Sequence, residues 1–204
     1  MVAPAAIVLA AGEGRRMGGP KALLVVDGQP LVRRHVDRLS EVGCDPIVVV
    51  VRPAIADRAR AVLADRPRVR LVAADTVSPA SSLAMGLRSL TIEDDTTVIV
   101  TPVDMIPAAP STVGALLSAA GDEGAHVATP RHRGRGGHPV VLRAPLLRVF
   151  LDGYRGTLRD LVRSAGGRRR QVDVDDAAVG GDLDTPADLD ALRAGAVVCS
   201  GSRR

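Results

Sequence analysis

The sequence predicts an α/β protein with a single doubly wound, mostly parallel sheet flanked by helices. Apolar runs that lack polar alternation recur along the chain, and such runs are typical of strands covered on both faces. Amphipathic stretches alternate with these runs, which indicates repeated strand–helix units. The 204 residues suffice for one domain, which would bury about 70% of its unfolded surface.

The first half of the chain supplies four strand–helix units. The expected strands are the apolar runs Ala5–Ala10, Pro46–Val51, Val69–Ala73 and Thr97–Val100. The expected helices are the amphipathic stretches Pro30–Val42, Ala54–Asp65, Ser81–Leu90 and Ser111–Ala120. This succession predicts the parallel part of the sheet.

The second half is less regular. Short strands are expected at Val127–Thr129, Pro139–Arg143 and Gln171–Val174, with a Gly/Arg/His loop at Arg131–His138. Helices are expected at Ala144–Leu151, Tyr154–Ala165 and Pro186–Arg193. Pro186 suits the first position of the last helix and Thr185 its cap. Residues 1–194 are therefore expected to form one domain, and residues 195–204 a C-terminal tail.

Composition excludes several classes of protein. Hydrophobic residues make up 46% of the chain and charged residues 25%, so it is neither disordered nor fibrous. Phe150 and Tyr154 are the only aromatic residues, so the stacking platforms of single-stranded nucleic-acid binders are missing. A net charge of +4 does not by itself indicate a nucleic-acid partner. The apolar runs are shorter than the roughly 18 residues that a membrane span requires. We expect a monomer with neither nucleic acid nor membrane as a partner.

The cysteines and the first residues predict a cytoplasmic protein. Cys44 and Cys199 lie far apart without metal or redox spacing, which is simplest in a reducing compartment. Residues 1–11 are apolar but lack a basic lead-in and continue into Gly-Glu-Gly-Arg-Arg. We interpret them as a buried first strand and not as a signal peptide.

A glycine-rich basic segment follows the first expected strand. It reads Leu9-Ala-Ala-Gly-Glu-Gly-Arg-Arg-Met-Gly-Gly-Pro-Lys21, at the carboxyl edge where doubly wound sheets bind ligands. Its glycines allow positive φ and let backbone N–H groups approach phosphate oxygens. Lys21 is the only lysine of an arginine-rich chain. The segment is neither a P-loop nor the dinucleotide fingerprint, because no Gly-Lys-Ser/Thr follows and the third glycine is missing.

This segment resembles the signature of nucleotidyltransferases. Leu-Ala-Ala-Gly, a short variable stretch, Arg-Met-Gly and a following lysine are shared by sugar-phosphate and CDP-alcohol pyrophosphorylases and by the MobA/MocA-like enzymes. The resemblance, from about Ala5 to about Leu192, implies the Rossmann-like nucleotidyltransferase fold and a loop that wraps a triphosphate. It makes Arg16 and Lys21 catalytic residues that bind phosphate charge. It also implies that the nucleotide is bound by Leu9, Ala10, Ala11, Gly12, Gly14, Gly18 and Lys21.

Two aspartates are candidate metal ligands. Asp104 comes shortly after the expected strand Thr97–Val100, with Ile106 as an additional residue before Pro107. Magnesium typically takes one or two protein carboxylates and completes its octahedron with water and phosphate oxygens. An aspartate at this place is the metal ligand in the resembled family, so the resemblance makes Asp104 both a catalytic residue and a ligand of Mg²⁺.

The second ligand lies near the last expected helix. Gly181-Asp-Leu-Asp-Thr-Pro-Ala-Asp-Leu189 is similar to the close of the family's domain, where an aspartate or asparagine is the second metal ligand. The chain has no asparagine, so this role falls to Asp184 or Asp182, and we assign Asp184. The alternative is helix capping by Asp184 or Thr185.

Two further segments resemble binding elements of the family. Ser81-Ser-Leu-Ala-Met-Gly-Leu87 resembles the segment beside the nucleobase, which adds Ser81 and Ser82 to the nucleotide-binding residues; a plain helix N-cap is the alternative. Gly137-His138-Pro139 resembles the acceptor-facing segment of the MocA-like branch. The arginines and histidines of the preceding loop suit an anionic acceptor, although a basic surface loop without a ligand stays open.

The resemblance therefore implies a Mg²⁺-dependent nucleotidyltransferase. An acceptor phosphate attacks the α-phosphate of a nucleoside triphosphate and pyrophosphate leaves, while fixed cations stabilise the developing charge. Leu-Ala-Ala-Gly and Gly-Gly-His-Pro-Val favour CTP as donor and molybdopterin as acceptor, with a molybdenum enzyme as a candidate recipient of the product. Thr-Pro-Val-Asp-Met instead resembles the GTP-using MobA-like branch. A sugar-phosphate acceptor, and a catalytically silent nucleotide-binding or cofactor-delivery module, are further alternatives.

Overall fold

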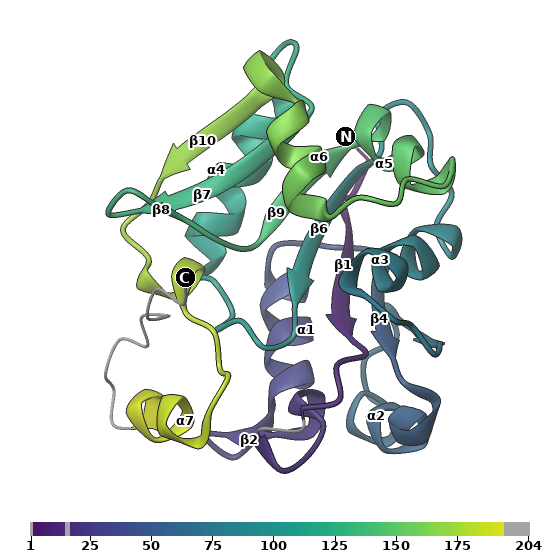
Figure 1. Ribbon diagram of the computed structural model, residues 1–204, viewed down its shortest axis with the longest axis vertical. Coiled ribbons are helices and arrows are strands. Elements are labelled where there is room, and N and C mark those ends of the chain that lie inside the picture. The colour runs from purple at the N-terminus through teal and green to yellow at the C-terminus, as the bar shows by residue number, and fades with distance from the viewer. Residues whose placement is uncertain (1, 15–16, 194–204) are drawn as a thin grey trace.

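In the computed structural model, which describes residues 2–14 and 17–193, the chain folds around an eight-stranded sheet (Figure 1). Seven strands follow the order β10-β7-β9-β6-β1-β4-β5, and β8 pairs with β7. Their bounds are β1 (Ala5–Ala10), β4 (Ile47–Val51), β5 (Val69–Ala73), β6 (Thr97–Pro102), β7 (Val127–His132), β8 (Arg135–Gly136), β9 (Val140–Arg143) and β10 (Arg169–Asp173). A separate hairpin joins β2 (Val25–Val26) to β3 (Gln29–Pro30).

The predicted fold class is confirmed, because most strand pairs of the sheet are parallel. β1 is parallel to both β4 and β6, β4 is parallel to β5, and β10 is parallel to β7. β8 and β9 are the exceptions, since β9 runs antiparallel to β6 and to β7 between them and the short β8 runs antiparallel to β7. The fold is therefore a doubly wound, mostly parallel sheet with two reversed strands near one side.

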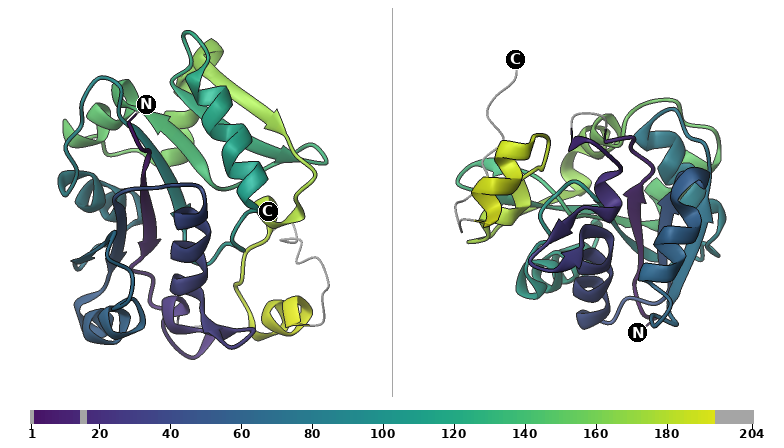
Figure 2. Two further views of the ribbon diagram at one scale, coloured as in Figure 1. Left: turned by 180° about the vertical axis from the view of Figure 1, so that it is seen from behind. Right: turned by 90° about the horizontal axis from the view of Figure 1, so that it is seen from below.

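Helices cover both faces of the sheet (Figure 2). The α-helices are α1 (Leu31–Glu41), α2 (Ala56–Val62), α3 (Pro79–Arg88), α4 (Pro110–Gly121), α5 (Ala144–Leu151), α6 (Leu158–Ser164) and α7 (Pro186–Arg193). Single 3-10 turns form η2 (Lys21–Leu23), η3 (Pro53–Ile55), η4 (Gly166–Arg168) and η5 (Ala177–Gly180). None of the helices in the described part of the chain combines the length and apolarity that a membrane crossing would need.

Two buried layers follow from the alternation of side chains along each strand. In β1, Ala6 and Val8 contribute to the layer that also contains residues of α1, α2 and α4. Ile7 lies between them in sequence and contributes to the opposite layer, with residues of α3, α5 and α6. A strand buried on both sides has no polar face, which is why the apolar runs predicted these strands.

Three predicted boundaries are corrected by the structure. The helix expected from Ser81 begins at Pro79, because Ser78 is its N-cap and Ser81 completes the capping box. The helix expected from Tyr154 begins only at Leu158, where Thr157 and Asp160 form a second capping box. The loop expected at Arg131–His138 instead contains the end of β7 and all of β8.

The chain reverses its winding direction beside β1. It proceeds from β1 to β4 and β5 on one side and then returns to β6 on the other side. The helices that follow β1 and β4 pack on one face of the sheet, whereas α3, which follows β5, packs on the other face. A crevice opens at the carboxyl ends of the strands where the winding reverses. The glycine-rich segment and Asp104 lie in the loops that follow β1 and β6.

One carboxylate fastens the segment after β10 to the start of α4. Asp176 accepts hydrogen bonds from the Ala109 amide and the Thr112 hydroxyl, each at 2.8 Å, and from the Ala178 amide at 3.0 Å. The carboxylate also lies at the N-terminal end of α4, where the helix dipole favours negative charge. This contact fixes η5 relative to the loop that follows β6.

We predict that Asp176→Ala lowers the free energy of unfolding by about 2–3 kcal/mol, because donors that bonded a charged group lose their partner. Urea unfolding monitored by circular dichroism measures the loss. Asp175→Ala is the matched control, since the neighbouring Asp175 side chain is fully exposed, and we expect a change of less than about 0.5 kcal/mol. Equal losses in the two variants would contradict the assigned role of Asp176.

Candidate active site

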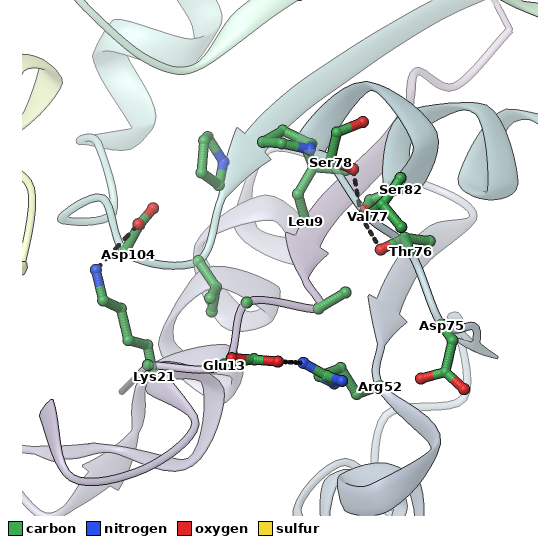
Figure 3. A pocket seen from close by; sticks show the side chains of 16 residues that line it. Leu9, Glu13, Lys21, Arg52, Asp75, Thr76, Val77, Ser78, Ser82 and Asp104 are labelled. Carbon is green, nitrogen blue, oxygen red and sulfur yellow. Dashed lines mark hydrogen bonds and ion pairs between the residues drawn. The ribbon is translucent and has the colours of Figure 1, made fainter. Parts of the chain in front are cut away.

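A cavity of about 820 Å³ lies at the crevice beside β1 (Figure 3). Its walls come from the loops after β1, β4, β5 and β6 and from the first turn of α3. The lining residues are Leu9, Ala11, Gly12, Glu13, Gly14, Lys21, Arg52, Asp75, Thr76, Val77, Ser78, Pro79, Ser82, Pro102, Val103 and Asp104. The volume is within the range of small-molecule sites, about 300–1,000 Å³.

The glycine-rich segment closes on itself at Gly14. This residue has a φ of +63°, and a Cβ there would lie only 1.9 Å from the carbonyl oxygen of Gly19. The Gly14 carbonyl accepts hydrogen bonds from the amides of Met17 and Gly19. Only glycine fits this combination of backbone conformation and close approach. The closed turn brings Lys21, seven residues further along, to the edge of the cavity.

Lys21 lies between two carboxylates from distant parts of the sequence. Its Nζ donates to Asp184 Oδ1 at 2.7 Å and to Asp104 Oδ2 at 3.2 Å. Burial alone would lower the pKa of Lys21, but the hydrogen bonds and charges of the two aspartates outweigh it and raise that pKa. The ammonium therefore stays charged, and the two aspartates converge on one cationic position.

A short antiparallel pairing holds these two aspartates side by side. The Ile106 amide donates to the carbonyl of Gly181, and the Leu183 amide donates to the carbonyl of Asp104 at 2.7 Å. Met105 and Asp182 form the bridge between these bonds. The additional residue Ile106 is thus part of the pairing that joins the loop after β6 to the segment before α7.

Asp188 fixes the backbone at Asp184. Its Oδ2 accepts hydrogen bonds from the amides of Asp184 and Thr185 and from the Thr185 hydroxyl. The Thr185 hydroxyl in turn accepts from the Asp188 amide. Thr185 therefore caps α7, as the sequence predicts. The side chain of Asp184 does not cap the helix but bonds Lys21.

His35 bonds the backbone of the loop that carries Asp104. It is 3% exposed, and its Nε2 lies 2.9 Å from the carbonyl oxygen of Met105. Burial lowers the pKa of His35 to about 4. The ring is therefore neutral at pH 7 and donates to a carbonyl directly after Asp104. This histidine of α1 is a structural support for the carboxylate loop.

Most of the predicted nucleotide-binding residues line the cavity. They are Leu9, Ala11, Gly12, Gly14, Lys21 and Ser82. Ala10 is buried within the sheet, and Gly18 is outside the lining set. The hydroxyl of Ser81 bonds Ser78 at the N-cap of α3, so only its neighbour Ser82 reaches the cavity wall. Arg16 and the predicted tail at residues 195–204 lie outside the described residues.

The predicted acceptor segment lines a second cavity. Gly137 and His138 contribute to it, whereas Pro139 does not. A Cβ at Gly137 would lie 1.5 Å from the Val179 carbonyl oxygen, so glycine is required where this wall meets η5. His138 is almost fully buried, and burial lowers its pKa. Among the described residues, its Nδ1 is a buried side-chain atom without a hydrogen-bond partner.

The structure adds residues that the sequence analysis missed. Arg52, just after β4, pairs with Glu13 across the mouth of the first cavity. Asp75 and Thr76, just after β5, line the wall opposite Lys21, and Thr76 Oγ1 lies 2.6 Å from Ser82 Oγ (Figure 3). Each of these residues follows the carboxyl end of a predicted parallel strand. The rule that located Lys21 and Asp104 could therefore have located them too.

Comparison with known proteins identifies the family. The model of the MobA-like NTP transferase domain matches residues 6–172 of this chain. The chain belongs to the MobA-like NTP transferase family. The family predicted from Leu9–Lys21 is thereby confirmed, and the protein is a nucleotidyltransferase of MobA-like type.

Curated relatives of this MobA-like domain include molybdenum cofactor enzymes. The molybdenum cofactor guanylyltransferase of Acidiphilium cryptum is 31% identical over 196 residues, which cover 93% of this chain and 94% of the relative. A probable molybdenum cofactor guanylyltransferase of Opitutus terrae is 50% identical over 48 residues, 24% of each protein. The match to the bifunctional enzyme IspD/IspF of Novosphingobium aromaticivorans spans 33% of this chain and only 18% of that protein.

Solved structures share the fold of this MobA-like domain. Rv0371c from Mycobacterium tuberculosis superposes with a TM-score of 0.81 at 23% identity, over 95% of this chain and 99% of that chain. A nucleotidyl transferase from Methanothermobacter thermautotroptrophicus has a TM-score of 0.77 at 23% identity, over 96% and 98%. At these identities the likeness concerns the fold.

We predict that acidification destabilises the protein through His35. The unfolded histidine binds a proton below a pKa of 6.5, whereas the native ring does so only near 4. Stability is therefore lost as the pH falls from 6.5 to 4, by about 3 kcal/mol for this group. His35→Gln keeps an N–H donor for the Met105 carbonyl but does not titrate. Urea unfolding at several pH values should show a flatter slope for this variant, and an unchanged slope would contradict the assignment.

Proposed function

We propose that this protein is a Mg²⁺-dependent nucleotidyltransferase that transfers a nucleoside monophosphate to the phosphate of a molybdopterin-type acceptor. The observation that carries the proposal is the position of Lys21. It joins Asp104 and Asp184 at the end of a glycine-rich turn, on the wall of a cavity at the winding reversal of the sheet. The full-length similarity to a molybdenum cofactor guanylyltransferase supports the choice of acceptor.

The two aspartates suit a magnesium ion. They converge on a single cation, the ammonium of Lys21, from backbones that are fixed by hydrogen bonds. Within the described ranges no group of three or more His, Cys, Asp and Glu side chains could hold a metal. We therefore propose a site in which the protein supplies only two of the ligands. Two carboxylates with remaining positions for water and phosphate are the donor set that Mg²⁺ takes in phosphoryl-transfer sites. When bound, the ion neutralises charge on the phosphates.

The residues of the chain then have distinct roles in transfer. Backbone N–H groups of the glycine-rich turn and the charges of Lys21 and Arg16 hold the triphosphate. An oxygen of the acceptor phosphate forms the new bond to the α-phosphorus, the bond from that phosphorus to the bridging oxygen breaks, and pyrophosphate leaves with the electron pair. No general base is required, because the acceptor phosphate is already ionised at neutral pH. Lys21 and the closed backbone stabilise charge on the departing pyrophosphate.

Two nucleotides are candidates for the donor. GTP is favoured by the relative that matches over nearly the full length of both chains, since that protein is named a guanylyltransferase. CTP is favoured by the sequence Leu9-Ala10-Ala11-Gly12, in which Ala11 lines the cavity. The wall formed by Asp75, Thr76 and Ser82 offers oxygen atoms to the exocyclic amino group that both bases carry. We propose GTP as the first candidate and CTP as the second, for a monomeric cytoplasmic enzyme that passes its product to a molybdenum enzyme.

Pyrophosphate release from GTP, CTP, UTP and ATP, each with Mg²⁺ and with or without molybdopterin, tests the proposal. We expect release from one nucleotide, and only when the acceptor is present. Release with a sugar phosphate instead of molybdopterin would overturn the choice of acceptor. No release with any combination, together with nucleotide binding in calorimetry, would favour the catalytically silent alternative.

We predict that Lys21→Ala lowers turnover by about 10²–10³-fold, the typical cost of removing one preorganised charge from a transition state. The fold should persist because Lys21 lies on a cavity wall and not in the core. Lys21→Arg is the matched variant, since it keeps the charge but replaces a compact ammonium by a planar guanidinium. Initial rates and thermal unfolding of both variants give the comparison. Turnover near the wild-type level in Lys21→Ala would show that the phosphates bind elsewhere.

A further inference from the structure

The second cavity, of about 490 Å³, begins at the pairing of Met105 with Asp182 and extends to α6. Met105 and Asp182, which form the bridge next to Asp104, line one part of it. Another part is lined by α6, where Leu158 and Val162 contribute apolar surface. The cavity therefore reaches the backbone pairing next to Asp104, although neither Asp104 nor Asp184 is among its lining residues, and it is large enough for a small molecule.

Positive charge dominates the lining of this cavity. Its arginines are Arg159 and Arg163 of α6 and Arg169 of β10, whereas Asp182 is the acidic residue among the lining set. Burial keeps His138 neutral, because its pKa is lowered. Three guanidinium groups against one carboxylate leave the lining with net positive charge, and a concave site of that kind attracts anionic ligands.

The arginines differ in how they are held. Arg169 donates from both Nε and Nη2 to the Thr129 hydroxyl, each at 3.1 Å. Arg159 and Arg163 lie four residues apart and therefore on one face of α6. Throughout residues 2–14 and 17–193, neither of these two has a carboxylate within 4 Å, whereas Arg33 and Arg34, for example, each pair with an aspartate. Asp160 of the same helix interacts with both charges from a greater distance and is itself bonded to Thr157. The hydrogen-bond donors of Arg159 and Arg163 can therefore bind a ligand.

We propose that Arg159 and Arg163 bind a second anionic group of the acceptor, remote from the phosphate that reacts. The acceptor would extend through the second cavity from the Asp104–Asp184 pair to α6. Its body would lie against Leu158 and Val162, and its far end would accept hydrogen bonds from the two guanidinium groups. This inference rests on the proposed function for the identity of the bound molecule, and it makes the arginine pair a determinant of acceptor specificity.

Steady-state kinetics tests the role of the pair in transfer. Arg159→Gln and Arg163→Gln should each raise the KM for molybdopterin about tenfold, which corresponds to the loss of one charge-assisted hydrogen bond. The KM for the nucleotide should not change. Arg58→Gln is the matched control, because Arg58 is also an exposed residue of a seven-residue helix but lies outside both cavities. An unchanged KM for the acceptor in the double variant would overturn the proposal.

Binding of inorganic phosphate tests the anion site without any turnover. In ¹⁵N-edited NMR spectra of the whole protein, phosphate should shift the amides of Gly137 and of α6 as well as those of the glycine-rich turn. The double variant should lose the shifts at α6 and keep those at Gly12 and Gly14. Shifts at α6 that persist in the double variant would refute the assignment to the arginines. Because this readout needs no reaction, it separates failure of the anion site from failure of the proposed function.

Discussion

The site depends on a two-residue pairing between segments almost eighty positions apart. Residues 104–106 and 181–183 exchange backbone hydrogen bonds. Asp104 begins the first segment, Asp184 directly follows the second, and both bond Lys21. His35 bonds Met105 within the first segment, and Asp188 bonds the amide of Asp184 directly after the second. Asp176 bonds the amide of Ala109, which follows the first segment. Backbone bonds therefore fix the distance between two like charges that would otherwise move apart.

The sheet positions everything else around that pairing. β1 has β4 on one side and β6 on the other, so the glycine-rich turn and Asp104 emerge at the same edge. The Val103 amide bonds the Leu9 carbonyl, which ties the two loops together where they leave the sheet. A crevice at such a winding reversal is a geometric consequence of the strand order and needs no special residues. Residues of the loops decide what the crevice binds.

The sequence predicted best those features that local patterns determine. The bounds of β1, β5, α5 and α7 agree with expectation, because apolar runs, an early proline or a capping residue mark them locally. β5 nevertheless lies at the edge of the sheet and is not buried on both faces as the sequence predicted. The start of α3 was missed although its capping box, Ser78 and Ser81, is local too. The sequence indicated only part of the second cavity, since Gly137 and His138 were predicted to face the acceptor and the arginines of α6 were not. Arg159 and Arg163 come to line the same cavity as Gly137 only after α6, β9 and η5 are packed, and no local spacing in the sequence encodes that arrangement.

Charge balance explains why such a site can be stable without substrates and still accept them. Lys21 with Asp104 and Asp184 carries a net charge of −1, so the ammonium relieves the repulsion between the aspartates but does not cancel their charge. Removing one partner of a buried group of ion pairs destabilises the folded state by more than the intact group stabilises it, because the remaining charges stay desolvated. The side-chain exposure of the two aspartates, 37% and 39%, limits that cost and leaves their outer oxygens accessible to a divalent cation. In the proposed reaction a lysine suits this position, because its flexible stem would let a compact charge turn from the carboxylates toward the phosphates, whereas a planar guanidinium would stay bound to a carboxylate.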